Sequence, residues 1–349
     1  MVFQGGPGDE EGPGRRNIAN DTSRRREVTA TLSGTTGQMT TPDTALPGTY
    51  GEAPPGYRLS EASGLGAVRL QVADLDRSLA FYQEMLGLRV ARRGGSQAIL
   101  AAQGSDTPLL HLHERPGARP APRRGQLGLY HFAILLPDRP SLGRFMRHLG
   151  EIGARAGSAD HLVSEALYLQ DPDNLGIEVY ADRPRHTWRR MGRELMMASD
   201  PIDAAGLMQE AGEIAWTGMP AGTTIGHVHL HVGDLATSSA FFAEALGFDR
   251  MVWGYPGALF LGAGGYHHHL GTNIWAGSGA KPSASGDARL LEWTIELPDE
   301  ASLASLEDSI RRSGYAAERA GLSGAELVTR DPWGTDIRVR VARASSGDR

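Results

Sequence analysis

Two histidines occupy the same place in two similar segments of this chain, and together they could hold a metal ion. Each segment is an apolar strand that ends in Asp, and the histidine precedes that Asp by seven positions: His131 in HFAILLPD and His227 in HVHLHVGD. The chain contains no cysteine, so any metal must be held by histidine and carboxylate side chains. The spacing therefore predicts a localised metal site on a repeated scaffold.

The same strand occurs twice more, with other residues at the histidine position. Ala67 precedes Asp74 by seven positions, and Glu292 precedes Asp299 by seven. Each of the four strands is followed by an amphipathic helix and then by about three short apolar runs. The chain therefore reads as four βαβββ modules.

The modules predict the domain organisation. With 349 residues and 40% hydrophobic content, the chain can bury one or two cores. We expect two domains of two modules each, at residues 61–184 and 223–343, with residues 185–222 as the connector. Residues 1–60 are rich in Gly, Pro, Ser, Thr and Arg and cannot bury enough apolar surface to fold, so we expect a disordered tail there. Residues 344–349 form a second, short tail.

Charge and apolar content limit the partners of the protein. The formal net charge is −6 and the cationic residues are dispersed through the folded part, which argues against a nucleic-acid partner. The arginine clusters near Arg15 and Arg25 are not followed by an apolar segment, which argues against an export signal. No run reaches the roughly 18 apolar residues of a membrane helix. We therefore expect a soluble, cytoplasmic protein without a membrane partner.

Several strings resemble a known superfamily. The helix LxxSxxFYxxxLG, the ending DPDxxxIEVY and the four βαβββ units are similar to the vicinal oxygen chelate superfamily, which includes glyoxalase, fosfomycin-resistance proteins and type I extradiol dioxygenases. Within residues 61–342, GLYHFAILLPDR, SEALYLQDPDNLGIEVYADRPR, IGHVHLHVGDL and GGYHHHLGTNIWAG most resemble the bacterial catechol 2,3-dioxygenase branch. The resemblance implies an α+β fold in which the four modules form two cup-shaped mixed β-sheets with flanking helices.

The resemblance also implies a metal and a reaction. Extradiol enzymes hold iron through two His and one Glu on one face of the ion, which leaves room for both oxygens of a catechol and for dioxygen. Here the implied ligands are His131, His227 and Glu178, which lies seven residues after Asp171. We therefore expect an Fe(II)-dependent extradiol dioxygenase, with Mn(II) as the other candidate ion. It would be a homo-oligomer that converts a small aromatic diol and O2 to a ring-opened semialdehyde.

The ligand positions also predict which modules share the metal cup. The offset that gives Glu178 in the second module gives Arg338 in the fourth, and Arg338 cannot ligate a cation. The first module has Ala67 at its histidine position. The main hypothesis is therefore that modules two and three share a cup, which the long connector allows.

Sequential pairing of the modules is the alternative. In the first half, His111 or His113 would then have to complete a site with the two ligands of module two. In the second half, His227 would need Glu292 and a histidine from the 267–269 run.

Three further residues are implied to act in catalysis. Extradiol enzymes carry an acid/base histidine at the place that matches the HisHisHis run, and the motif alignment favours His268, with its neighbours as alternatives in register. A second family signature, GRHxxSNAFFLY, corresponds to ADHLVSEALY, which is two residues shorter and offers His161 and Tyr168. The two histidines would assist proton transfer and charge stabilisation, and Tyr168 would hydrogen-bond a substrate oxygen.

The remaining histidines are candidates for binding the substrate. Strand alternation points the three histidines of HVHLHV to one face, where they would line the cavity mouth or hydrogen-bond the metal ligands. In the HisHisHis run, the outer two share a face and the middle one takes the other. The candidate substrate-binding residues are His229, His231, His267, His269 and Asn273.

Two other functions use the same fold. A non-catalytic binding or resistance protein would have lost its ligand positions, whereas three survive here. A glyoxalase-like metal-dependent isomerase would usually keep four ligands with two acids, and His111 stands roughly where the second acid would be. Both remain alternatives to the dioxygenase.

Overall fold

The chain is described by a computed structural model over residues 41–342. The expectation of a tail over residues 1–40 and 344–349 lies outside the described residues. Within the described range, none of the helices combines the length and the apolar character that crossing a lipid bilayer requires.

Residues 41–60 differ from the expected tail because they are folded onto the rest of the chain. The short strand β1 (Asp43–Thr44) pairs with β10 (Arg189–Met191) of the connector. The side chains of Tyr50 and Leu59 are buried, and the Tyr50 hydroxyl donates to the Gly265 carbonyl at 2.7 Å. The few apolar residues of this segment complete a core that other segments supply, which the composition of the segment alone cannot reveal.

All four expected modules are present as a strand, a helix and three strands. Module one consists of β2 (Gly64–Val72), α1 (Leu75–Glu84), β3 (Arg89–Gly94), β4 (Gln97–Ala101) and β5 (Pro108–Glu114). Module two consists of β6 (Gln126–Leu135), α2 (Arg139–Glu151), β7 (Gly157–Asp160), β8 (Ser164–Gln170) and β9 (Gly176–Asp182). Module three consists of β12 (Thr224–His231), α4 (Leu235–Ser238) with its π-helical continuation η2 (Ser239–Ala245), β13 (Asp249–Val252), β14 (Ala258–Gly262) and β15 (Leu270–Asn273). Module four consists of β17 (Arg289–Leu297), α5 (Glu300–Arg312), β18 (Glu318–Ala320), η3 (Leu322–Gly324), β19 (Glu326–Arg330) and β20 (Asp336–Val341).

The Asp that closes each repeated motif caps the helix that follows. In every module its carboxylate accepts a hydrogen bond from the backbone N–H three residues further on, as an N-cap residue does. The capping residues are Asp74, Asp138, Asp234 and Asp299. Because the cap fixes where the helix begins, a residue seven positions earlier occupies an equivalent place on the first strand of each module.

The modules pair in a nested order, two with three and one with four. In the 2–3 sheet the strand order is β13-β14-β15-β12-β6-β9-β8-β7, and antiparallel β12 and β6 join the two modules. In the 1–4 sheet the order is β18-β19-β20-β17-β2-β5-β4-β3, joined through β17 and β2. The hypothesis that modules two and three share a cup is confirmed, and sequential pairing is wrong. Each domain expected from the sequence thus contributes one module to each sheet.

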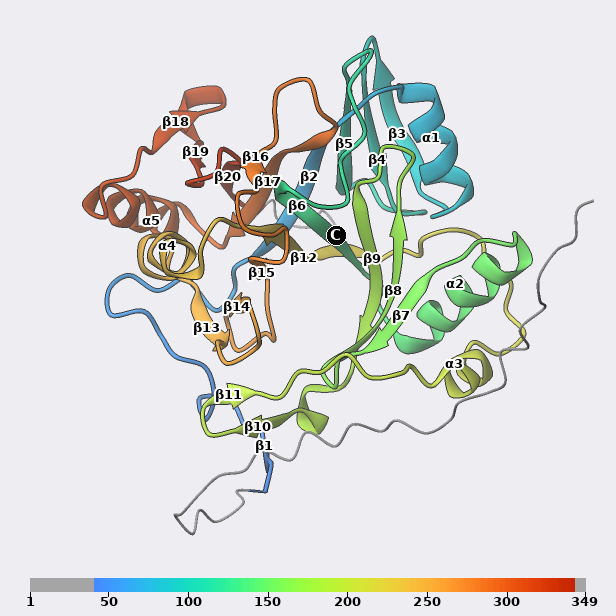
Figure 1. Ribbon diagram of the computed structural model, residues 1–349, viewed down its shortest axis with the longest axis horizontal. Helices are drawn as coiled ribbons and strands as arrows, with labels where there is room; N and C mark the ends of the chain where they lie inside the picture. The colour runs from blue at the N-terminus through green and yellow to red at the C-terminus, as the bar shows by residue number, and fades with distance from the viewer. Residues whose placement is uncertain (1–40, 343–349) are drawn as a thin grey trace, which may run out of the picture. The chain divides into compact units, whose positions relative to one another are not determined.

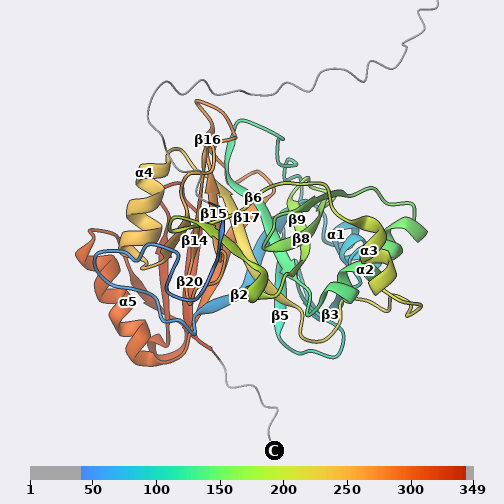
Figure 2. The ribbon, with the colours of Figure 1, turned by 90° about the horizontal axis from the view of Figure 1, so that it is seen from below.

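Strand alternation separates a shared core from the two cup faces. On the four first strands, one set of alternate residues is buried in a single continuous hydrophobic cluster. This set includes Val68, Leu70, Phe132, Ile134, Val228, Leu230, Trp293 and Ile295. Helices α4 and α5 lie on one side of the sheets, and α1, α2 and α3 (Ala204–Glu210) lie on the other (Figures 1 and 2). The other set of alternate residues faces the cups, where the histidines and charged residues are found.

The connector, residues 185–222, is folded and packs on module two. It contains η1 (Arg185–Thr187), β10, β11 (Glu194–Leu195) and α3. Helix α3 approaches α2 so closely that a Cβ added to Gly143 would lie 2.2 Å from the Leu207 carbonyl oxygen. The absence of a side chain at Gly143 therefore permits this contact, which holds the connector beside the 2–3 sheet.

Replacing Gly143 with Ala is expected to lower the free energy of unfolding by about 1–3 kcal/mol, because the added methyl group collides with backbone of α3. Gly150→Ala is the matched control: it lies in the same helix, and a Cβ there meets nothing within 4 Å. The control is expected to be neutral or to stabilise by up to roughly 1 kcal/mol. Urea unfolding measures both variants. Equal stabilities would show that α3 is not held against α2 at this position.

Candidate metal centre

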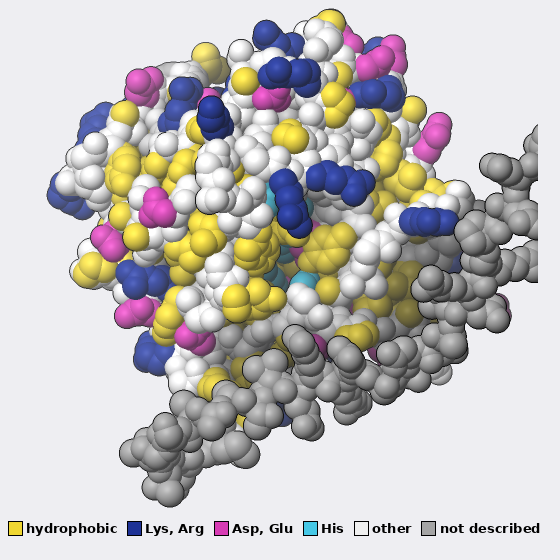
Figure 3. Space-filling view, in the orientation of Figure 1, with side chains coloured by type: hydrophobic (Ala, Val, Ile, Leu, Met, Phe, Trp, Pro, Cys, Tyr) yellow, Lys and Arg dark blue, Asp and Glu magenta, His cyan; other side chains and the backbone are white. Residues whose placement is uncertain are grey.

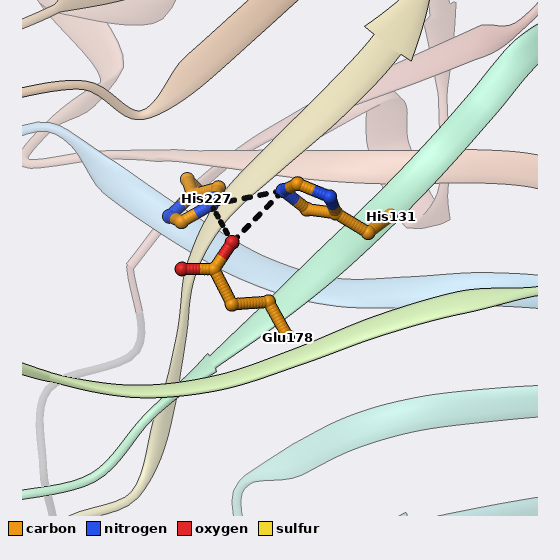
Figure 4. Close-up of side chains that lie close together, drawn as sticks. All are labelled: His131, Glu178 and His227. Carbon is orange, nitrogen blue, oxygen red and sulfur yellow. Dashed lines mark hydrogen bonds and ion pairs between the residues drawn. The ribbon is translucent and has the colours of Figure 1, made fainter. Parts of the chain in front are cut away.

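Three side chains from three adjacent strands converge in the 2–3 sheet: His131 on β6, His227 on β12 and Glu178 on β9 (Figure 4). Glu178 Oε2 lies 3.0 Å from His131 Nε2 and 3.2 Å from His227 Nε2, and the two Nε2 atoms are 3.3 Å apart. Ligands about 2.1 Å from one ion are separated by roughly 3.0–3.4 Å when the bond angles lie between a right angle and the tetrahedral value. The three groups therefore fit one face of a single metal ion.

Strand register explains why these residues meet. Ala133 on β6 is paired with His227 on one side and with Glu178 on the other. His131 lies two residues earlier on β6 and so points to the same face. The small side chain of Ala133 leaves the space above it to the three larger groups.

Burial and mutual contacts shift the pKa values of His227 and Glu178. His131, His227 and Glu178 are all buried. Burial lowers the pKa of His227 to about 4, although Glu178 opposes the shift. Burial alone would raise the pKa of Glu178, but His227 and His131 bring it well below its usual range. Near pH 7, Glu178 is thus ionised and His227 neutral, which are the states in which these groups bind a metal.

A cavity of about 190 Å³ opens beside the triad. Four further predicted site residues line it: His161, Tyr168, His229 and His268. The sequence reasoning missed the rest of the lining, which consists of Tyr130, Ala159, Met197, Ala198, Ser199, Tyr255, Phe260 and Trp275. The face of the molecule in Figure 3 is hollowed near its centre, where His side chains are seen behind hydrophobic and cationic ones.

Two of the missed residues carried a signal, and three carried none. Tyr130 and Trp275 are aromatic residues inside the strings that resemble the dioxygenases, so they could have been identified. Residues 197–199 belong to the connector and reach the cavity because Asp160 and Asp200 exchange backbone hydrogen bonds of 2.8 and 2.9 Å. That contact is between distant segments and leaves no trace in local sequence.

His161 and Tyr168 form a hydrogen-bonded pair at the cavity wall. His161 Nδ1 lies 2.6 Å from the Ala198 carbonyl oxygen, which can only accept, so Nδ1 carries a proton and donates this hydrogen bond. The Tyr168 hydroxyl then donates to His161 Nε2, at 2.5 Å. Tyr168 is the cross-strand partner of Glu178. Burial and the nearby Glu178 raise the pKa of Tyr168 well above its usual value, so its hydroxyl stays protonated.

His268 is held by a chain of hydrogen bonds that ends on Asp182. The sequence predicted that residues 267–269 lie on a strand. In the structure they lie in a bend before β15. His267 Nε2 lies 2.8 Å from Asp182 Oδ1, and His267 Nδ1 lies 2.7 Å from His268 Nδ1. The Asp182 carboxylate accepts from His267 Nε2–H, which leaves the lone pair of His267 on Nδ1. His267 Nδ1 therefore accepts a hydrogen bond from His268 Nδ1–H.

This arrangement leaves the lone pair of His268 on Nε2. Burial lowers the pKa of His268 well below its usual value, so the ring is neutral at rest. Its centroid lies 4.2 Å from that of His227. A neutral imidazole with a free nitrogen beside the ligand triad can accept a proton from a bound molecule.

Of the predicted substrate-binding residues, His229 lines the cavity and the other four do not. Asn273 donates to His229 Nε2 at 2.9 Å and accepts from His231 Nδ1 at 2.7 Å. His267 lies behind His268, and His269 Nδ1 accepts from the Ala263 N–H at 3.2 Å. The structure thus places these four residues behind those that line the cavity.

The residues that sequential pairing would require from modules one and four lie in the other sheet. His111 and His113 are on β5, and Glu292 on β17 forms two hydrogen bonds of 2.8 and 2.9 Å with the guanidinium of Arg338. Across residues 41–342, the triad of His131, Glu178 and His227 is the one group of three or more potential ligands that comes together.

Comparisons with known proteins identify the family that has this fold and this site. The Glyoxalase/Bleomycin resistance protein/Dioxygenase superfamily matches residues 64–179. A catechol-2,3-dioxygenase from Bacillus subtilis (strain 168) is 46% identical over 264 residues, which is 74% of this chain and 92% of that protein. The chain therefore belongs to this superfamily, and the resemblance found in the sequence is confirmed.

Solved structures share the fold at low sequence identity. A crystal structure from Bacillus subtilis subsp. subtilis strain 168, assigned as a dioxygenase, superposes with a TM-score of 0.56 at 13% identity and covers 82% of this chain and 87% of that one. Glyoxalase I from Zea mays gives a TM-score of 0.49 at 20% identity, covering 80% of this chain and 92% of that one. The first of these confirms the α+β fold of cup-shaped mixed sheets with flanking helices.

Proposed function

We propose that the protein is an extradiol ring-cleaving dioxygenase that uses Fe(II), or Mn(II), to open catechol or a substituted catechol beside its two hydroxyl groups. Both atoms of O2 would enter a ring-opened semialdehyde. The observation that carries the proposal is the facial set of His131, His227 and Glu178 at the wall of a cavity that also holds a neutral histidine. The relative that is 46% identical and named a catechol-2,3-dioxygenase supports the same reaction.

When bound, the ion would supply coordination for both substrate oxygens and for dioxygen, together with a path for electrons between them. His268 Nε2 would take a proton from a substrate hydroxyl. The resulting imidazolium would be stabilised through His267 by the carboxylate of Asp182.

Tyr168 and His161 would act on the other side of the substrate. Because the Tyr168 hydroxyl donates to His161, the oxygen of Tyr168 is free to accept a hydrogen bond from a catechol hydroxyl. The bond from His161 Nδ1 to the Ala198 carbonyl keeps the imidazole in the tautomer that this pairing needs. The pair would thereby orient the ring of the substrate over the ligand triad.

The lining of the cavity favours an uncharged catechol. Tyr130, Tyr255, Phe260 and Trp275 give it aromatic walls, and none of the described residues that line it is Lys or Arg. A carboxylate on the substrate ring would find no cationic side chain among the residues that line this cavity, and burying it unpaired is costly. The substrates we propose are therefore catechol and catechols with small uncharged substituents.

The other functions of this fold suit the site less well. A glyoxalase-like isomerase that needs two acids would find one carboxylate, Glu178, among the described residues that line the cavity. A metal-free binding protein would have no need for three ligand atoms about 3 Å apart, at 3.0, 3.2 and 3.3 Å.

We also propose that the protein is a homo-oligomer, as the resemblance implies. Light scattering of the purified protein measures this oligomeric state.

Anaerobic loading with Fe(II), followed by catechol and oxygen, is expected to give a yellow semialdehyde with one O2 consumed per catechol. Loading with Mn(II) in parallel decides between the two ions. As a matched substrate control, 3,4-dihydroxybenzoate is expected to react at least about tenfold less efficiently because its carboxylate lacks a partner. Protein that retains either metal but opens no ring would contradict the proposal.

A further inference from the structure

The cup face of the 1–4 sheet carries an ion pair where the 2–3 sheet carries two of its metal ligands. Arg338 stands at the place of Glu178, and Glu292 at the place of His131. These two residues form an ion pair at 2.8 Å, so the second cup has exchanged a cation site for a pair of its own charged groups. The Glu292–Arg338 pair occupies only part of this face.

A cavity of about 590 Å³ lies beside that ion pair. Its polar lining comes from Arg69, Arg92, Arg93, Gln97, His111 and His113. Its larger apolar lining residues are Ile99, Leu112 and Leu291. A smaller cavity of about 290 Å³ shares Arg69 and His111 with it and extends to the ion pair. The lining of the larger cavity includes no Asp or Glu among the described residues.

Not all of the arginines near this cavity are neutralised. Arg93 pairs with Asp76 at 2.5 Å, and Arg340 pairs with Glu296 at 2.7 Å. Within residues 41–342, Arg69 and Arg92 make no ion pair. Two guanidinium groups with free charge therefore face a concave surface.

The register of the strands places Arg69 and Arg92 on opposite sides of His111 and Ile99. Arg69 pairs with His111, His111 with Ile99, and Ile99 with Arg92 across strands β2, β5, β4 and β3. Arg69 and Arg92 are thus three strand spacings apart, roughly 14 Å, and an extended Arg side chain reaches about half of that distance. Both can contact one group lying over His111 and Ile99. Burial and the charges of Arg69, Arg340 and Arg92 lower the pKa of His111. The electrostatic potential of these arginines is therefore positive at the His111 side chain.

We propose that the cup of the 1–4 sheet binds a small organic acid, with its carboxylate between Arg69 and Arg92 over His111 and its apolar part against Ile99 and Leu291. Guanidinium groups pair with carboxylates in charge-assisted hydrogen bonds, and His111 adds a further donor. The apolar lining distinguishes this site from one for inorganic phosphate, which has no apolar part to bury. The site is independent of the metal centre.

Titration calorimetry of the full chain with benzoate, at low ionic strength, tests the proposal. Benzoate is expected to bind, inorganic phosphate to bind more weakly, and benzamide, the neutral analogue of the same shape, to give no measurable heat. Arg69→Gln is expected to raise the Kd for benzoate by about tenfold or more. Arg312→Gln, on the exposed end of α5, is the matched control and is expected to leave the Kd unchanged.

Arg92→Gln repeats the test from the other side of the cavity and is expected to weaken binding in the same way. Thermal unfolding of each variant shows whether it is folded, and both positions are exposed, so folding is expected to be intact. Benzoate binding that Arg69→Gln and Arg92→Gln leave unchanged would place the anion elsewhere and overturn the proposal. Benzamide binding as tight as that of benzoate, or no benzoate binding to the wild-type chain, would overturn it as well.

Discussion

Glu178→Gln is expected to lose its metal during anaerobic gel filtration and to show no measurable ring cleavage. Glu178 is the one negatively charged member of the triad, and a neutral amide cannot replace the charge that faces the ion. Structural zinc sites with four protein ligands have binding free energies of about 10–16 kcal/mol, which corresponds to roughly 2.5–4 kcal/mol for each ligand, or about seventy- to a thousandfold in affinity. Metal content by mass spectrometry and oxygen uptake measure the two effects.

Glu292→Gln is the matched control for that experiment. Glu292 is also a carboxylate on a cup face, but it lies in the 1–4 sheet and pairs with Arg338. The variant is expected to retain metal and activity, although loss of the ion pair can lower its stability. If Glu178→Gln holds metal as firmly as the control does, the assigned ligand set is wrong.

His268→Gln is expected to keep its metal and to lose about 10²–10⁴-fold in turnover with catechol. Nε2 of His268, the ring nitrogen that does not bond His267, is the proposed acceptor of a substrate proton, and general acid–base catalysis contributes about that factor. Because His268 is outside the ligand triad, metal content should match that of the wild-type protein. Steady-state oxygen uptake and metal analysis on the same preparation separate the two effects.

His269→Gln is the control for that variant, since it changes the next residue in the chain to the same amide. His269 does not line the cavity, and its Nδ1 accepts from the Ala263 N–H. Its turnover is expected to stay within about threefold of wild type. Turnover in His268→Gln equal to that in His269→Gln would remove His268 from the proposed mechanism.

The modules could be read from the sequence because one short-range interaction repeats. Each Asp cap fixes the start of its helix, and strand alternation carries that register back to His131 or His227. The pairing of modules could be inferred because chemistry excluded the alternatives: Ala67 and Arg338 cannot bind a cation. Both inferences use residue types at fixed offsets from recognisable Asp residues, so they need no knowledge of contacts between distant segments.

Three other features could not be predicted, because they depend on contacts between segments that are far apart in the sequence. Residues 41–60 fold because Tyr50 and Leu59 fit into cores built by other parts of the chain. Met197 reaches the metal cavity because the connector is anchored to β7 through Asp200. His267 looked like a substrate contact in the sequence, and only the position of Asp182 places it behind His268. Nothing in the local pattern at these residues distinguishes one arrangement from another.

The nested pairing of modules constrains how the protein can be made. When synthesis has reached residue 184, modules one and two are complete, yet both sheets still lack their other half. The edges of β2 and β6 stay open until β17 and β12 emerge from the ribosome. Open strand edges are prone to wrong association, so the nascent first half is the species with the greatest tendency to misassociate. The metal ligands also assemble late, because His227 joins His131 and Glu178 only after the connector has been synthesised.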